Sequence, residues 1–182
     1  GVQRKLGYIK LPTFYSSMNF GNSPDVTQRS ATLDVARLIS ELNSEDVEGL
    51  ILDLRSNGGG SLPEAVYLTG LFIRTGPVVQ VKEARRTIPL PDNDPAIAFT
   101  KPLVVMVNRL SASASEIVAG ALQDYGRAIV VGDSRTHGKG TVQTLVPLAN
   151  GTLGSLKATT ASFYRINGSS TQIRGVESDI RL

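Results

Sequence analysis

The sequence predicts one α/β domain, because apolar runs of strand length alternate with segments of helical periodicity. Two of the runs, residues 49–55 and 102–108, are apolar almost throughout, which is typical of strands buried on both faces of a sheet. Residues 31–42 carry apolar side chains at the i, i+3, i+4 and i+7 positions of an amphipathic helix. A chain of 182 residues is long enough for one such core and too short for two, so we expect residues 1–182 to form a single domain.

The remaining elements follow from the same two patterns, with glycine, proline and polar clusters marking their ends. Further strands are expected at residues 6–11, 78–81, 128–131, 141–148 and 156–165. Further helices are expected at residues 63–72 and around residues 117–122. Loops are expected over residues 13–25, which are rich in polar residues, and over residues 85–100, where Pro and Asp predict an exposed excursion.

Composition excludes several classes of function. The chain has no cysteine, which rules out disulfides, thiolate metal sites and a cysteine nucleophile. Its 19 basic and 16 acidic side chains form no block of like charge, so nucleic-acid binding has little support. No apolar run approaches the roughly 20 residues that a membrane helix needs. We expect the one histidine, His137, at the surface rather than in a metal site or a Ser-His-Asp triad.

One candidate site lies where the first buried strand ends, at Leu54-Arg-Ser-Asn-Gly-Gly-Gly60. Glycines adopt positive φ angles and let a ligand or a second backbone come close. Their N–H groups, beside the start of the helix that follows, would suit an anion or an oxyanion. A tight turn without a ligand explains the same residues equally well.

A second junction of this kind, residues 108–116, follows the other buried strand. Ser113 would stand at a helix N-terminus, where the helix dipole favours the negative charge that a nucleophilic hydroxyl develops. The spacing of Ser113 and Glu116 also fits a capping box, in which the serine accepts a hydrogen bond from the helix backbone. From this segment alone, capping is the simpler interpretation.

Lys139 stands between two glycines and is open to close approach from both sides. A lysine amine can replace histidine as the base for a serine when burial keeps the amine neutral. If the next strand begins at the lysine, alternation places Lys139, Thr141 and Gln143 on one face, where Gln143 would hold the amine in position. An isolated Gly-Lys-Gly, however, is more often a surface turn.

Several segments together resemble the signature blocks of the tail-specific, or C-terminal processing, proteases, in the same order along the chain. The blocks are residues 52–60, 111–117, 123–127 and 138–143, with a C-terminal block at residues 163–168, 175–176 and 179–180. The resemblance extends from about Gly7 to the end of the chain. Because four blocks in order are far more specific than any one, they favour the catalytic interpretation of each segment.

The resemblance implies a serine endopeptidase with a crotonase/ClpP-like α/β core, which consists of stacked β-β-α units with helices outside a central sheet. Ser113 matches the family nucleophile, Lys139 its general base, and Gln143 the glutamine that orients the amine. The implied reaction is acyl transfer on a protein or peptide chain near its C-terminus. It needs neither a metal nor a cofactor.

The resemblance also implies an oxyanion hole, formed by the backbone N–H of Ala114 and that of Gly60 or Gly59. Asp124 falls where close relatives often carry an acidic residue. We interpret Asp124 as structural support rather than as a base.

Two features depart from the family pattern. Lys139 follows Ser113 by 26 positions, one more than the resemblance implies, and the family would carry a bulky aromatic where Thr136-His137 stands. The relatives also carry a PDZ domain that captures the substrate's C-terminus. No such domain is expected within these residues, and we expect it upstream in the full-length protein.

A rival hypothesis is a non-catalytic module that binds apolar ligands or peptides on the same fold, as the retinoid-binding proteins of photoreceptors do. In that case Ser113 would be only a helix cap and Lys139 only a turn residue. The resemblance further implies a bacterial protein of the periplasm or cell envelope, with no integral membrane segment and no nucleic-acid partner.

Overall fold

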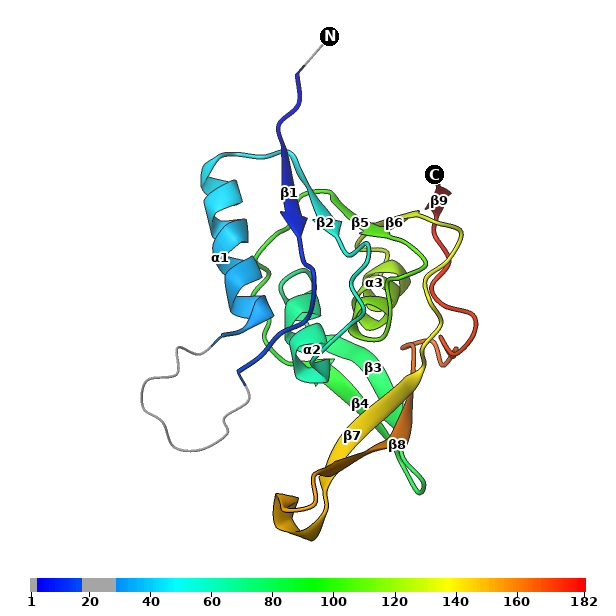
Figure 1. Ribbon diagram of the computed structural model, residues 1–182. Helices are drawn as coiled ribbons and strands as arrows, with labels where there is room; N and C mark the ends of the chain where they lie inside the picture. Colours follow the sequence, from blue (N-terminus) through cyan, green and yellow to red (C-terminus); the bar gives the residue numbers. More distant parts are fainter. Residues whose placement is uncertain (1–2, 18–28) are drawn as a thin grey trace.

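A parallel sheet of five strands carries the fold (Figure 1). The computed structural model describes residues 3–17 and 29–182, so part of the loop expected over residues 13–25 lies outside the described residues. The strands lie in the order β1-β2-β5-β6-β9, and neighbouring strands are parallel. Their bounds are Leu6–Lys10 for β1, Gly49–Asp53 for β2, Leu103–Val107 for β5, Ile129–Gly132 for β6 and Ile180–Arg181 for β9.

A second, antiparallel sheet has the strand order β4-β3-β8-β7. Its strands are β3 (Gly76–Lys82), β4 (Thr87–Asp92), β7 (Thr141–Pro147) and β8 (Ser155–Tyr164). Strands β7 and β8 form a long hairpin that projects from the body of the molecule, with the short helix η1 (Ala149–Gly151) near its tip (Figure 1).

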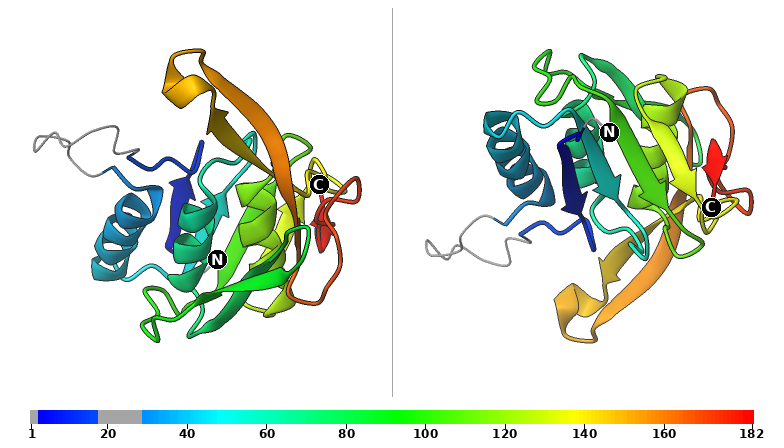
Figure 2. Two further views of the ribbon diagram at one scale, coloured as in Figure 1. Left: turned by 90° about the horizontal axis from the view of Figure 1, so that it is seen from below. Right: turned by 90° about the horizontal axis from the view of Figure 1, so that it is seen from above.

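The described residues also form the α-helices α1 (Ala31–Ser44), α2 (Leu62–Gly70) and α3 (Ala114–Asp124). Helix α3 contacts β6 of the parallel sheet and β3 of the antiparallel sheet, and every residue from Ala114 to Leu122 is buried. Figure 2 shows the helices gathered against one face of the parallel sheet. A helix covered on both sides in this way has no polar face, which explains why α3 is apolar or small almost all round.

The predicted α/β class is confirmed, and each strand or helix expected from the two patterns is present. Most of residues 85–100 are exposed as predicted, but the loop assignment was wrong for residues 87–92, which form β4 and pair with β3. Pro89 and Pro91 had argued against a strand, but β4 lies at the edge of its sheet, where proline is tolerated. Strand β9 was not predicted, since two residues carry no periodic signal.

The end of β2 is held by an acidic side chain, Asp53, which is 1% exposed. Its carboxylate accepts hydrogen bonds from the Arg55 side chain at 2.9 and 2.7 Å, from the Arg55 backbone N–H at 2.9 Å, and from the Tyr8 hydroxyl. Burial alone would raise the pKa of Asp53, but these hydrogen bonds outweigh it and lower the pKa to about 2. This network fixes the start of the glycine turn that follows β2.

We predict that Asp53→Asn lowers the free energy of unfolding by about 2 kcal/mol at pH 7. The carboxyl's pKa is lowered by folding, so its stabilisation is complete above the ordinary value near 4 and is lost as pH falls toward 2. Urea unfolding at pH 7 and pH 2.5 should show the difference between variant and parent shrinking at the lower pH. Asp46→Asn, at a side chain that is 95% exposed and pairs with Lys101, should change stability far less. A difference that stays constant with pH would contradict this account.

Candidate active site

The two predicted junctions meet at one edge of the parallel sheet. Strands β2 and β5 are parallel neighbours, so the loops that follow them leave the sheet side by side. The backbone carbonyl of Asn57, in the glycine turn, accepts hydrogen bonds from the N–H of Ala112 at 3.0 Å and the hydroxyl of Ser115 at 2.9 Å. Because Asn57 is fully buried, the serine loop and the glycine turn form one rigid unit.

The structure distinguishes the three serines of the loop. Ser111 and Ser115 are fully buried, and their hydroxyls donate to backbone carbonyls of Leu54 and Asn57 at 2.8 and 2.9 Å. Ser113 is half-buried and lines an open cleft. The hydroxyls of Ser111 and Ser115 therefore stabilise the loop, while that of Ser113 lies at the cleft.

Ser113 has a strained backbone, with φ at 58° and ψ at −113°. A residue with a side chain adopts such a conformation at a cost of roughly 1–3 kcal/mol, and residues of this kind are concentrated at functional sites. Ser113 ends the turn between β5 and α3 and is the N-cap of α3. The turn thus lifts the hydroxyl into the cleft at the positive end of the helix dipole.

Glu116 connects Ser113 to the segment that carries Lys139. Its side chain is fully buried. One carboxylate oxygen, Oε2, accepts the backbone N–H of Ser113 at 2.8 Å and that of Lys139 at 2.9 Å. The other, Oε1, accepts the N–H of Gly138 at 2.7 Å and the hydroxyl of Thr136 at 2.6 Å. The capping-box spacing had predicted a hydrogen bond from the helix backbone to the serine, so the role of the Glu116 side chain as acceptor for residues 136–139 was missed.

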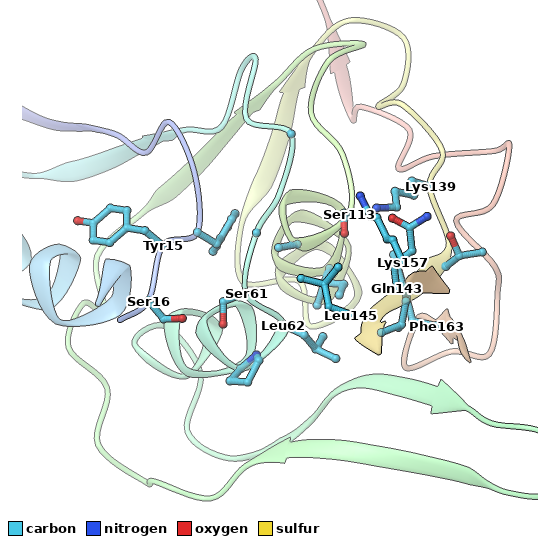
Figure 3. A pocket seen from close by; sticks show the side chains of 18 residues that line it. Tyr15, Ser16, Ser61, Leu62, Ser113, Lys139, Gln143, Leu145, Lys157 and Phe163 are labelled. Atoms are coloured by element: carbon cyan, nitrogen blue, oxygen red, sulfur yellow. The ribbon is translucent and has the colours of Figure 1, made fainter. Parts of the chain in front are cut away.

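Lys139 is half-buried and lines the same cleft as Ser113, together with Thr141 and Gln143. Figure 3 shows the side chains of Lys139 and Gln143 gathered on one side of Ser113. The strand begins at Thr141 rather than at the lysine, but the three residues that alternation placed on one face do line the cleft together. The register shift opposite Val142 and Gln143 skips one residue of β8, so the alternation of side chains along β7 is kept.

The turn before Lys139 is anchored on both sides. The N–H of Thr136 donates to the carbonyl of Val176, and the N–H of His137 donates to that of Ser111 at 3.0 Å. The His137 side chain is exposed, as the sequence predicted. The segment is thus held in place where it donates its hydrogen bonds to Glu116.

The glycine turn comes very close to Ser113. A Cβ atom on Gly59 would lie 2.8 Å from the Cβ of Ser113, and one on Gly60 would lie 2.2 Å from the carbonyl oxygen of Phe14. The N–H of Gly59 donates to the Asn57 side chain at 2.9 Å, which argues against Gly59 as an oxyanion donor. Gly60 and Ala114 both line the cleft, so this pair remains the candidate oxyanion hole.

The cleft has a volume of about 670 Å³ and is lined mainly by apolar and small residues. Asp124 does not line it. Its carboxylate instead accepts hydrogen bonds from Arg165 at 2.9 and 2.7 Å and from Asn167 at 2.8 Å, which agrees with a structural role. Among residues 3–17 and 29–182, no group of three or more His, Asp and Glu side chains is placed to hold a metal ion. Within the same ranges, no helix has the length and apolar character to cross a bilayer.

Comparison with known proteins gives consistent matches. The sequence profile of peptidase family S41 matches residues 5–182. The chain is 46% identical to the tail-specific protease of Haemophilus influenzae, over 97% of this chain and 24% of that protein. It is 36% identical to the chloroplastic C-terminal processing peptidase of Tetradesmus obliquus, over 100% of this chain and 36% of that protein. The structure of a photosystem II D1 C-terminal processing protease superposes with a TM-score of 0.81 at 34% identity, over 97% of this chain and 42% of that one. The chain thus spans well under half the length of these relatives.

The strain at Ser113 generates a prediction about stability. Glycine adopts positive φ freely, so Ser113→Gly should be more stable than Ser113→Ala by about 1 kcal/mol. Urea unfolding of the two variants measures the difference. At Ser115, inside α3, the order should reverse, because glycine is less favourable than alanine in a helix by roughly 1 kcal/mol. If the alanine variant were the more stable one at position 113 as well, the backbone of Ser113 would carry no strain.

Proposed function

Because this chain belongs to peptidase family S41, we propose that it is the catalytic core of a serine endopeptidase, with Ser113 as nucleophile and Lys139 as general base. Its substrates would be protein or peptide chains, cleaved near their C-terminus. The observation that carries the proposal is the buried Glu116 carboxylate, one oxygen of which binds the backbone N–H groups of both Ser113 and Lys139. Nucleophile and base are thereby fixed to one atom at the same cleft.

The chemistry follows from this arrangement. The amine of Lys139, in its neutral form, takes the proton of Ser113 as Oγ attacks a peptide carbonyl carbon. Gln143 would hold the amine toward the hydroxyl. Negative charge develops on the carbonyl oxygen, and the N–H groups of Ala114 and Gly60 would stabilise it. The lysine then gives its proton to the leaving amine, and water hydrolyses the acyl-enzyme.

The rival hypothesis of a non-catalytic binding module gains less support from these residues. A serine that only caps a helix has no need of a strained backbone, whereas Ser113 keeps one at a cost of roughly 1–3 kcal/mol. The PDZ domain upstream and a location in the bacterial periplasm or cell envelope are part of the same proposal, and both rest on the resemblance.

We expect the protein to hydrolyse an unstructured polypeptide with an apolar C-terminus. Ser113→Ala and Lys139→Ala should each lower kcat at least a thousandfold, and the double variant should be no worse than either one, because the two groups act as a unit. Gel-based proteolysis and circular dichroism would measure activity and folding. Lys10→Ala, at an exposed lysine outside the cleft, is the control. Equal activity in all variants would refute the assignment of these two residues.

Glu116 is expected to act as a positioning residue. Glu116→Gln places an amide N–H group where backbone N–H donors now point, so kcat should fall roughly ten- to hundredfold with KM little changed. Glu64→Gln is a matched control. Glu64 is also buried and accepts several hydrogen bonds, from Ser30 and Thr32. Both variants should lose stability, but only Glu116→Gln should lose kcat. Unchanged kcat in Glu116→Gln would mean that Glu116 serves the fold alone.

A further inference from the structure

A second lysine, Lys157 of β8, lines the same cleft. Figure 3 shows it beside Gln143, in the group of side chains next to Ser113. The strand register explains its direction. Lys157 is the cross-strand partner of Leu145, which also lines the cleft, and its sequence neighbours Leu156 and Ala158 do not. Partners across an antiparallel pair point to the same face of the sheet.

The two lysines have different surroundings. Lys139 is half-buried, lies between two glycines and has its backbone fixed by Glu116. Lys157 is exposed, lies on the face of a strand and, among the residues that the structure describes, joins no salt bridge. An exposed lysine of this kind carries its positive charge at neutral pH.

The charge of Lys157 has no counterpart in the cleft. Among residues 3–17 and 29–182, the side chains that line the cleft include two lysines, Lys139 and Lys157, and no aspartate or glutamate. If Lys139 acts as a neutral base, Lys157 is the one cation that the described residues place at the cleft while a substrate binds. The other lining residues are apolar or small, or carry neutral polar groups.

We propose that Lys157 is a specificity residue that binds a carboxylate of the substrate close to the scissile bond. The proposal rests on the proposed function for the reaction itself, but it concerns binding. The carboxylate would belong to an acidic side chain or to the substrate's own C-terminus, and the chemistry of recognition is the same for both. The aliphatic stem of Lys157 lies beside Leu145. An apolar substrate residue would pack against this part of the β7–β8 hairpin, while the neighbouring carboxylate meets the Lys157 amine.

The expected effect is moderate, because the amine is exposed and flexible. A charge-assisted hydrogen bond at such a site should favour a carboxylate substrate by roughly three- to tenfold in kcat/KM. Since the attraction is electrostatic and solvent-exposed, the preference should shrink when the salt concentration is raised from about 0.1 M to about 1 M.

Two pairs of otherwise identical short peptides test the proposal. In one pair, Glu replaces Gln near the cleavage site; in the other, a free C-terminal carboxylate replaces a C-terminal amide. The ratio of kcat/KM within each pair is measured for the parent protein, Lys157→Met, Lys157→Glu and Lys82→Met. Lys82 is an exposed strand lysine of the same sheet that does not line the cleft. Dissociation constants of the four peptides for Ser113→Ala are measured with and without Lys157→Met.

The parent and Lys82→Met should prefer the carboxylate member of at least one pair, and the pair that responds identifies the source of the carboxylate. Lys157→Met should remove the preference and Lys157→Glu should reverse it. A preference that persists in Lys157→Met, or slower cleavage of all peptides at an unchanged ratio, would overturn the proposal. The dissociation constants separate the proposed function from the proposed carboxylate site. If nothing is cleaved but the carboxylate preference in binding depends on Lys157, the proposed function fails and the carboxylate site stands; if binding shows no preference, the carboxylate site fails.

Discussion

The arrangement of the site depends on one buried charge, the carboxylate of Glu116. An isolated ionised carboxyl is very costly to bury, and it is retained only where hydrogen bonds replace its water. Four donors do so here, and they come from two segments more than 20 residues apart in sequence: Ser113, and residues 136–139. Since each donor is needed to satisfy the charge, the two segments cannot separate without leaving part of it unpaired. The hydrogen bonds that Glu116 requires thus hold the backbone of Ser113 close to that of Lys139.

The two sheets contribute different parts of the site. The parallel sheet supplies Ser113 and the glycine turn, because the loops after β2 and β5 leave the same edge and are joined through Asn57. The antiparallel sheet supplies Gln143 and Lys157 from the β7–β8 hairpin (Figure 1). Helix α3, buried between the two sheets, begins next to Ser113, the proposed nucleophile, and carries Glu116 on its first turn. The cleft therefore lies between the parallel and the antiparallel sheet, and helix α3 contacts both sheets.

Most strands and helices and the main site residues could be predicted from the sequence. The features that could not be predicted each have a physical reason. Strands β2 and β5 and helix α1 were predicted because burial on two faces or on one stripe leaves a clear apolar pattern. The edge strand β4 was missed because a sheet tolerates proline only in an edge strand. The sequence alone does not show which strand lies at an edge. Ser113 and Lys139 were found by resemblance, whereas their meeting at Glu116 depends on tertiary contacts that no spacing along the chain encodes. The spacing of Ser113 and Glu116 gave one half of that contact.

The β7–β8 hairpin divides into a root and an arm with different properties. The root, at Gly138 and Lys139, is bound to Glu116 and lies against the body of the domain. The arm beyond it is exposed, with Leu145 at 58% and Leu156 at 55% exposure, and it carries Lys157. Catalysis requires a base that holds its position to within a fraction of an ångström, and only the root has the contacts to provide that. Recognition of varied polypeptides, as proposed for Lys157, tolerates a more adaptable surface such as the exposed arm. If both proposals hold, one hairpin serves both tasks because the buried carboxylate immobilises its root and leaves its arm free to vary.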